Sequence, residues 1–276
     1  MTHLFSYEGR RVVVTGGASG VGAALLDVLA ELDVAHVTVL DLNAPSGPHD
    51  AFVATNLGDE GAVRAAIADV DGEVHALFNN AGVADTQAPL VVFSVNYLAV
   101  RTLSEGLLTR MPEASAIVNT ASIAGNLWRK RTDELDELLA LDLAESWKPS
   151  LDWFTDHGAT VQQAMGPYNF TKELVERYTL RSSRATMRRG VRTNALCPGP
   201  IDTPLDADFR AVASDKIVDW SIREMAGRPI SPREVAGALA FLGSPAASYV
   251  NGVNLDIDGG FSAALATRQL DMTGRS

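Results

Sequence analysis

Cysteine is almost absent from this chain, since Cys197 is the only one in 276 residues. A single cysteine excludes an intrachain disulfide and suits a reducing compartment. No apolar run in the sequence approaches the roughly 20 residues that a membrane-spanning helix needs. The N-terminal MTHLFSYEGRR lacks the charged start and the apolar core of a signal peptide. We therefore expect a cytoplasmic protein with no membrane partner.

Basic residues are also few, with 23 Lys and Arg against 34 Asp and Glu and a net charge of −11. Nucleic acids and anionic membranes select basic patches, so we expect neither as a partner. The five histidines lack metal-ligand spacing, and none pairs with Cys197 in sequence, so we expect no metal site. The chain also lacks the G-x-S-x-G elbow of α/β hydrolases and a P-loop lysine.

The chain does contain short apolar runs that alternate with helical patterns. The runs are rich in Val, Ile and Leu without a polar alternation, as in strands buried on both faces of a parallel sheet. They occupy residues 11–16, 36–42, 51–57, 74–82, 115–122, 191–199 and 253–260. The sequence thus predicts one α/β domain over residues 1–276, a doubly wound (Rossmann) fold with a seven-stranded parallel sheet.

One long connection, about residues 126–164, interrupts this alternation. Thr132 and the acids after it predict the start of a helix, and Ser150 before LDWFTDHG predicts a second short helix ended by Gly158. Connections of this length are functional or disordered, and the Leu and Trp content argues against disorder. We expect an inserted pair of helices.

The stretch TGGASGVG, residues 15–22, follows the first strand and opens the first helix. Its glycines allow a tight turn and close approach of the backbone to a pyrophosphate, although an ordinary strand-to-helix turn has the same appearance. Asp41 ends the second strand, where a carboxylate binds ribose hydroxyls; a loop-capping aspartate is the alternative. A carboxylate repels a 2′-phosphate and no Lys or Arg is near, which favours NAD over NADP. The candidate ligands are Gly16, Ser19, Gly20, Val21, Gly22, Asp41 and Leu42, followed by Asn80, Ala81 and Gly82 after the fourth strand.

Tyr168 and Lys172 stand four residues apart in GPYNFTKELVERYTL, which places them on one face of a helix. Ser122 ends the fifth strand at the edge where ligands of such sheets bind. Lowering a tyrosine pKa from about 10 to about 7 takes roughly 4 kcal/mol, and a nearby ammonium can supply much of it. The phenolate would accept an alcohol proton, and the serine would hydrogen-bond the substrate oxygen. Taken alone, the Tyr–Lys spacing is an ordinary surface pair.

TGGASGVG, NNAG, TAS, YNFTK and LCPGPIDTP, in this order from about residue 9 to 262, resemble the short-chain dehydrogenase/reductase family. The resemblance implies that Ser122, Tyr168 and Lys172 are catalytic, and that the Asn96 backbone carbonyl anchors a water in a proton relay. It also implies that Lys172 and Tyr168 contact the nicotinamide ribose. Further cofactor contacts implied by the family are Asn56 and Leu57 near the adenine and Pro198, Ile201 and Thr203 at the carboxamide.

The sequence departs from the family pattern mainly in the long connection from Ser122 to Tyr168, which stand 46 positions apart. A helical insertion here is similar to that of a subgroup with 3α-hydroxysteroid dehydrogenase/carbonyl reductase and coniferyl-alcohol dehydrogenase. In the family, one subunit interface uses helices at residues 92–110 and 166–188, and inserted helices would obstruct it. We expect a homodimer or homotetramer, with a dimer through the C-terminal strand favoured.

All four tryptophans lie in the insertion or in the variable segment of about residues 203–228, which covers the substrate in the family. They predict either an apolar roof over the nicotinamide or packing that fixes the inserted helices to the body, and both interpretations are left open. With Ser122 and Tyr168, Trp128 is the substrate-contact candidate. The roof would suit a bulky hydrophobic substrate such as a steroid, terpenoid or aromatic alcohol. A non-catalytic dinucleotide-binding regulator is the alternative function.

Overall fold

The computed structural model describes residues 4–270 of the predicted domain. Within them, seven parallel strands form one sheet in the order β3-β2-β1-β4-β5-β6-β7, which confirms the predicted fold. Each strand ends earlier than predicted, because the glycine and polar residues that follow it form loops. The strands are β1 (Arg11–Thr15), β2 (His36–Asp41), β3 (Ala51–Ala54), β4 (Ala76–Asn79), β5 (Ala116–Thr120), β6 (Arg192–Pro198) and β7 (Asn254–Ile257).

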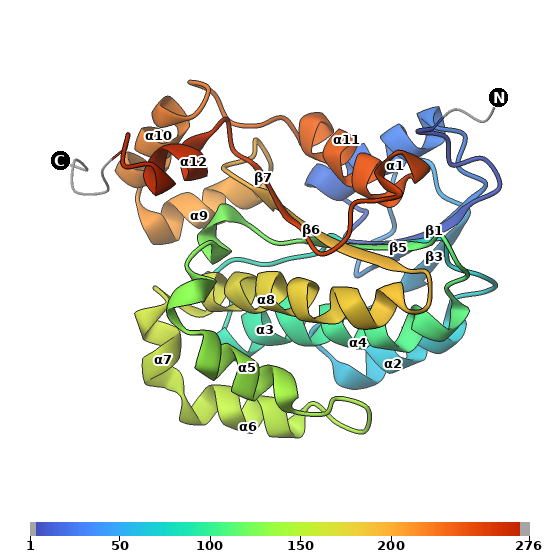
Figure 1. Ribbon diagram of the computed structural model, residues 1–276, viewed down its shortest axis with the longest axis horizontal. Coiled ribbons are helices and arrows are strands. Elements are labelled where there is room, and N and C mark those ends of the chain that lie inside the picture. Colours follow the sequence, from blue (N-terminus) through green and yellow to red (C-terminus); the bar gives the residue numbers. More distant parts are fainter. Residues whose placement is uncertain (1–3, 271–276) are drawn as a thin grey trace.

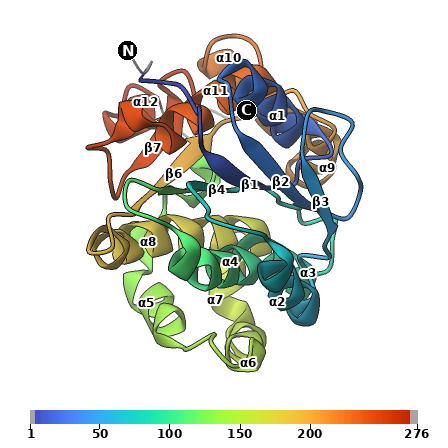
Figure 2. The same ribbon diagram turned by 90° about the vertical axis from the view of Figure 1, so that its right-hand side faces the viewer.

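Helices cover both faces of the sheet (Figures 1 and 2). One face carries α1 (Gly20–Glu31) and α11 (Pro232–Gly243), and the other carries α2 (Glu60–Asp69), α3 (Pro89–Phe93), α4 (Ala99–Leu107) and α8 (Pro167–Met187). Beyond the carboxyl end of β6 lie α9 (Leu205–Ala213) and α10 (Asp215–Glu224), and α12 (Phe261–Ala266) follows β7. None of the helices in residues 4–270 is both long and apolar enough to cross a membrane.

Alternate residues of the strands supply two separate apolar cores. In β1, Val12 and Val14 pack with α1 and α11, while Val13 belongs to the core on the opposite face. This two-sided burial explains why the strand sequences are apolar throughout. Helix α11 begins with a capping box in which Ser231 Oγ accepts from Glu234 N and Glu234 Oε2 accepts from Ser231 N at 2.9 Å.

The insertion forms three helices, not two, and they make an outer layer against α2, α4 and α8 (Figure 2). They are α5 (Thr132–Ala140), α6 (Lys148–Asp156) and α7 (Gly158–Gln163). The start predicted at Thr132 is correct. The start predicted at Ser150 is wrong, because Ser146 Oγ accepts the Lys148 N–H at 3.1 Å and Pro149 occupies the first turn. Gly158 begins α7 instead of ending the segment.

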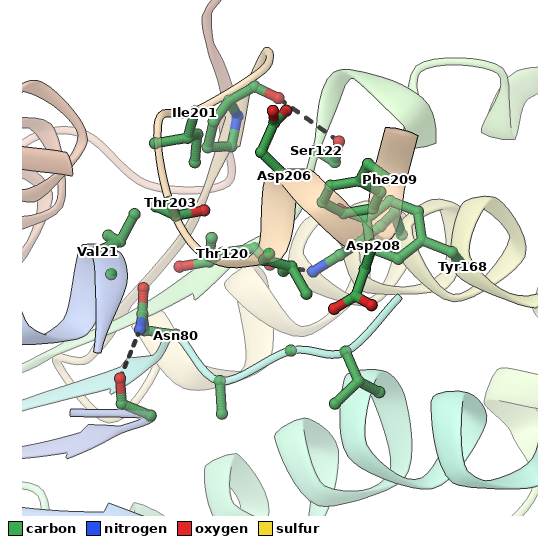
Figure 3. Close-up of a pocket in the computed structure, with 18 of the residues that line it drawn as sticks. Val21, Asn80, Thr120, Ser122, Tyr168, Ile201, Thr203, Asp206, Asp208 and Phe209 are labelled. Atoms are coloured by element: carbon green, nitrogen blue, oxygen red, sulfur yellow. Dashed lines mark hydrogen bonds between the residues drawn. The ribbon is translucent and has the colours of Figure 1, made fainter. Parts of the chain in front are cut away.

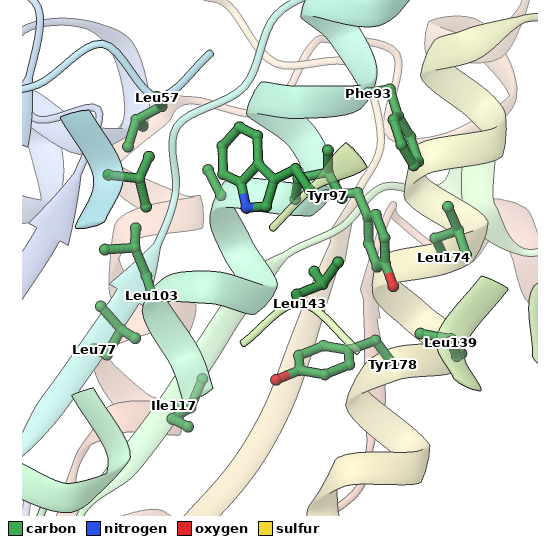
Figure 4. Close-up of a cluster of buried hydrophobic side chains, with 14 of the residues drawn as sticks. Leu57, Leu77, Phe93, Tyr97, Leu103, Ile117, Leu139, Leu143, Leu174 and Tyr178 are labelled. Carbon is green, nitrogen blue, oxygen red and sulfur yellow. The ribbon is translucent and has the colours of Figure 1, made fainter. Parts of the chain in front are cut away.

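Side chains of the insertion complete the core beneath the sheet. Leu139 and Leu143 lie with Tyr97 and Tyr178 in one buried cluster (Figure 4). Trp147 is 1% exposed, and its Nε1 donates to Thr102 Oγ1 of α4 at 2.8 Å. The insertion is therefore part of the folded core and not an appended flap.

Polar contacts fix the same layer at its edges. Arg64 of α2 donates to the carbonyl oxygens of Leu143 and Ala144 at 2.7 and 2.8 Å. Arg131 pairs with the buried Glu173 of α8 at 3.1 Å. Packing removes these charged and polar groups from water. Their hydrogen bonds and ion pair offset the free energy lost by that desolvation.

Replacing Trp147 by alanine should lower the free energy of unfolding by about 3–5 kcal/mol, the usual cost of deleting a large buried aromatic side chain. Urea unfolding followed by circular dichroism measures this. Lys148→Ala, next to it but with an exposed ion pair to Asp152, should change stability by less than about 1 kcal/mol. Equal stability of Trp147→Ala and the parent protein would contradict a structural role for the insertion.

Candidate functional site

The carboxyl ends of the strands open onto a cavity of about 630 Å³ (Figure 3). Loops after each of the strands β1 to β6, together with residues of α1, α8, α9 and α10, contribute its walls. The predicted residues that line it are Gly16, Ser19, Gly20, Val21, Asp41, Leu42, Asn56, Leu57, Asn80, Ala81, Gly82, Ser122, Tyr168, Lys172, Pro198, Ile201 and Thr203. Gly22, Asn96 and Trp128 do not line it.

The glycine loop has no room for side chains. Gly16 has a φ of +71°, and a Cβ there would lie 2.7 Å from Ala81 Cα. A Cβ at Gly22 would overlap the carbonyl oxygen of Gly16, so Gly22 acts behind the cavity by letting α1 pack closely on the loop. This is the division of roles that a pyrophosphate-binding turn requires.

Hydrogen bonds join the loops after β1 and β4. Thr15 Oγ1 accepts the backbone N–H groups of Asn80 and Ala81, both at 3.0 Å. Asn80 Nδ2 in turn donates to the carbonyl oxygens of Thr15 and Gly16, both at 3.3 Å. The two motifs therefore form one rigid floor, which explains their pairing in the sequence.

Asp41 lies at the end of β2, where its carboxylate reaches back to the glycine loop. Oδ2 accepts from Ala18 N at 3.0 Å and Oδ1 from Asn43 N at 3.1 Å. Leu42 beside it is 66% exposed, an apolar rim for a flat ring. Among the described residues that line the cavity, Lys172 is the only Lys or Arg.

Ser122, Tyr168 and Lys172 converge on the opposite part of the cavity. Ser122 begins the 3₁₀ turn Ile123–Gly125, and its Oγ accepts from Ala124 N at 3.2 Å. Tyr168 and Lys172 project from the first turns of α8, and Lys172 Nζ lies 5.4 Å from the centroid of the tyrosine ring. That ammonium donates to the Thr120 carbonyl oxygen at 2.8 Å.

The expected lowering of the Tyr168 pKa is not present in this structure. Burial raises the pKa of Tyr168 to about 12 and Asp85 adds to the rise, while a hydrogen bond with Ser122 opposes it. Burial likewise lowers the pKa of Lys172 to about 8. The protein alone therefore favours a neutral phenol, since both groups are removed from water before any positive ligand is added.

Asn96 lies beneath the cavity, in the π-turn Ser94–Leu98. Its Oδ1 accepts from Val83 N and its Nδ2 donates to Val83 O, both at 2.9 Å. Nδ2 also donates to Thr171 Oγ1 of α8 at 3.4 Å. A widened helical turn of this kind disturbs the backbone ladder and is frequent at functional sites.

Asp85 is a residue of the site that the sequence did not reveal. Its Oδ1 accepts the backbone N–H of Tyr168 at 2.8 Å, so it satisfies the start of α8 from a distant loop. Burial raises its pKa, and the Tyr168 N–H opposes this. No local pattern could have identified it, because its partner is 83 residues further along the chain.

The segment predicted to cover the substrate does reach the cavity. Phe209 of α9 packs edge-on against Tyr168, with ring centroids 4.8 Å apart (Figure 3). Individual residues in this segment were not predicted, since an amphipathic helix alone does not show which side faces a ligand. Besides Thr203, its lining residues are Pro204, Leu205, Asp206, Asp208, Phe209, Ala213, Val218 and Ser221.

None of the four tryptophans lines the cavity, so the structure favours packing over a roof, the two interpretations that the sequence left open. Trp128 is 7% exposed in the core beneath the sheet, and the guanidinium groups of Arg129 and Arg177 lie 4.3 and 5.2 Å from its ring centroid. Trp220 packs edge-on against Phe261. Trp128 packs in this core and does not line the cavity, so the structure gives no support to its prediction as a substrate contact.

The geometry fits a dinucleotide. The glycine loop is tight enough for backbone amides to approach phosphates, and Thr120 Oγ1, buried in the lining, has no partner within residues 4–270. In those residues, no group of three or more His, Cys, Asp or Glu side chains is arranged for a metal ion. The chain's own groups can bind an anion, accept and donate protons, and exclude water.

Comparison with known proteins agrees with this geometry. Residues 10–132 match a family model described as short chain dehydrogenase, and residues 154–262 match one described as enoyl-(acyl carrier protein) reductase. The gap between the matches falls in the insertion. Coniferyl-alcohol dehydrogenase of Pseudomonas sp. (strain HR199 / DSM 7063) is 30% identical, over 92% of this chain and 97% of that protein.

Solved structures give the same result. The 3-alpha-hydroxysteroid dehydrogenase of Pseudomonas sp. B-0831, complexed with NADH, has a TM-score of 0.74 at 31% identity, covering 94% of this chain and 99% of its own. Gluconate 5-dehydrogenase of Burkholderia cenocepacia J2315, in complex with NADP and tartrate, has a TM-score of 0.69 at 26% identity, covering 95% and 98%. The predicted family resemblance is confirmed, and both cofactors occur among these neighbours.

Proposed function

Because the chain belongs to the short-chain dehydrogenase/reductase family, we propose that it is an NAD-dependent oxidoreductase that interconverts an alcohol and a carbonyl. The single observation that carries this proposal is the convergence of Ser122, Tyr168 and Lys172 on a cavity whose other end is the glycine loop. A proton acceptor and a dinucleotide cradle then share one cavity.

The reaction needs one hydride and one proton to leave the alcohol. The nicotinamide, when bound, supplies a hydride acceptor with a positive charge. Tyr168 Oη takes the hydroxyl proton as the hydride leaves the adjacent carbon, and Ser122 Oγ donates a hydrogen bond to the substrate oxygen. In the reverse direction Tyr168 returns the proton to the carbonyl oxygen.

Because the pKa of Tyr168 is raised, formation of its phenolate needs electrostatic stabilisation. The phenolate must form in a buried place, so it needs cations at short range. Lys172 is held there by the Thr120 carbonyl, and its charge together with that of the oxidised cofactor would favour proton removal. Asn96, bonded to Val83 and Thr171, is suited to anchor the water that carries the proton away.

The cofactor is proposed to be NAD. The Asp41 carboxylate lines the cavity beside the glycine loop, where it would meet the ribose of a bound cofactor, and the lining supplies no cation there to balance a 2′-phosphate. Like charges a few ångströms apart at a protein surface repel by a few kcal/mol.

The substrate is proposed to be bulky and hydrophobic, such as a steroid, terpenoid or aromatic alcohol. Phe209 places an apolar ring against Tyr168, and Leu205 and Val218 add further apolar surface to the covering segment. Asp206 is paired with Arg210 at 2.6 Å, whereas no hydrogen bond or ion pair within residues 4–270 engages Asp208. A free carboxylate in this wall would disfavour substrates that carry their own carboxylate.

A homodimer through β7 is proposed as the assembly, and the cytoplasm remains the predicted location. The insertion covers the outer side of α4 and α8 (Figure 2). This supports the proposal that it obstructs the subunit interface that the family forms through these two helices. Strand β7 ends the sheet and exposes Leu255 by 37%.

The main test is formation of NADH, followed by its absorbance, with steroids, terpenoid alcohols and cinnamyl-type alcohols as substrates. Tyr168→Phe should lower kcat/KM about 100- to 10,000-fold, because the proton acceptor is lost, while NADH binding by fluorescence stays intact. Turnover of short polyols alone would contradict the substrate proposal. Binding of NADH without turnover of any substrate would favour the alternative, a non-catalytic dinucleotide-binding regulator.

Cofactor preference should depend on the charge of Asp41. Titration by fluorescence should show NADH bound more tightly than NADPH, and Asp41→Asn should reduce the ratio at least about tenfold, or 1.4 kcal/mol. The asparagine loses the charge but retains an oxygen for Ala18 N, whereas Asp41→Ala loses both. Comparing the two variants therefore separates the effect of the charge from that of the loop contact. Equal binding of both cofactors by the parent protein would contradict the assignment.

Light scattering should give a dimer, and Leu255→Arg should dissociate it, since a buried unpaired charge at an interface is costly. Met187→Arg, at the end of α8, serves as the control and should leave the dimer intact. A tetramer in the parent protein would argue against obstruction by the insertion.

A further inference from the structure

Glu176 lies one helical turn after Lys172 on α8 and is 1% exposed. Its Oε2 accepts from Asn254 Nδ2 at 3.2 Å. Its Oε1 has no hydrogen-bond partner within residues 4–270. A buried carboxyl with an unmet acceptor costs stability, and an apolar side chain would avoid that cost. Its presence directly behind the lysine therefore calls for an explanation beyond packing.

The carboxyl supports the turn that carries Ser122. A Cβ at Gly125 would overlap Glu176 Oε1 and would lie 2.8 Å from the Lys172 carbonyl oxygen. The 3₁₀ turn Ile123–Gly125, which begins at Ser122, thus rests directly on the Lys172–Glu176 turn of α8. A shift of the carboxyl would be transmitted to both groups of the site.

Cys197 connects the same groups from β6. It is fully buried, in a core cluster with Ala121, the residue before Ser122, and Val175 of α8. Burial raises the pKa of the Cys197 thiol; Glu176 and Asp256 add to the rise, and Lys172 opposes it. The thiol therefore lies in the electric field of both the lysine and the carboxyl.

The charges of Glu176 and Lys172 are coupled. Burial raises the pKa of Glu176 to about 8; Asp256 and Glu173 add to this, and Arg129 and the Cys197 thiol oppose it. Burial lowers the pKa of Lys172 to about 8, and Cys197 and Glu176 oppose this. The two groups change charge over the same pH range, and each charge favours the other.

We propose that Glu176 is a positioning residue of this site, a buried carboxyl that keeps Lys172 cationic in alkaline solution and supports the Ser122 turn. The inference rests on the proposed dehydrogenase function. The sign follows from the charges: an ionised Glu176 favours the ammonium, so removing it lets Lys172 lose its proton at lower pH. A neutral lysine could no longer favour the Tyr168 phenolate.

The direct test is an NMR titration of the ligand-free protein with isotope-labelled lysine, which requires no substrate. The chain has four lysines, Lys130, Lys148, Lys172 and Lys216, so the signals can be assigned by single Lys→Arg variants. In Glu176→Gln the midpoint of Lys172 should fall by at least about half a pH unit. The alkaline limb of the kcat/KM profile should move to lower pH by a similar amount.

Glu173→Gln is the matched control. Glu173 is on the same helix and 1% exposed, with a pKa that burial raises to about 7, but it pairs with Arg131. Because Glu173 also adds to the raised pKa of Glu176, this variant should not lower the Lys172 midpoint or move the alkaline limb to lower pH; any shift should be upward. Coincident Lys172 titrations in Glu176→Gln and the parent protein would overturn the inference.

Asp256→Asn provides a second variant should Glu176→Gln fail to fold. Asp256 raises the pKa of Glu176, so its neutralisation should ionise Glu176 at lower pH and move the Lys172 midpoint upward. A downward or absent shift would overturn the inference. If the parent protein turned over no alcohol while the lysine titration behaved as expected, the proposed function would fail and the coupling would stand.

Discussion

Helix α8 lies between the sheet and the inserted helices, so its charged residues must find partners inside the protein. A helix on the surface could turn such residues to water. Here Lys172, Glu173 and Glu176 are each less than 5% exposed. This burial from two sides is the constraint on which the arrangement of the site depends, because desolvation acts on each of these three ionisable groups.

Each charged group meets that constraint in a different way. Glu173 has a guanidinium from the insertion, and Lys172 has a backbone carbonyl from β5. Glu176 has one amide donor and one oxygen without a partner. Stability and chemistry therefore compete in this helix: the packing that makes α8 rigid also raises the pKa of Tyr168, the opposite of what proton abstraction needs.

The sequence predicted the sheet well because parallel strands buried on both faces have a strong local signal. The glycine loop, Asp41, Ser122 and Tyr168 were recognisable for a related reason: each occupies a fixed place at a strand or helix end. Asp85 and Phe209 were not, since they meet Tyr168 through contacts between distant segments. The sequence could not decide the role of the tryptophans, because a large apolar side chain predicts burial but not whether it is buried in a cavity wall or in a core.

The insertion has a further consequence for how the fold behaves on dilution. In the family resemblance, the outer side of α4 and α8 is a subunit contact, and a helix covered by another subunit loses its cover when the protein is dilute. Trp147, Leu139 and Leu143 cover that side from within the same chain, at an effective concentration that dilution cannot change. The rigidity of the helix that carries Tyr168 and Lys172 is thereby separated from the association equilibrium of the protein.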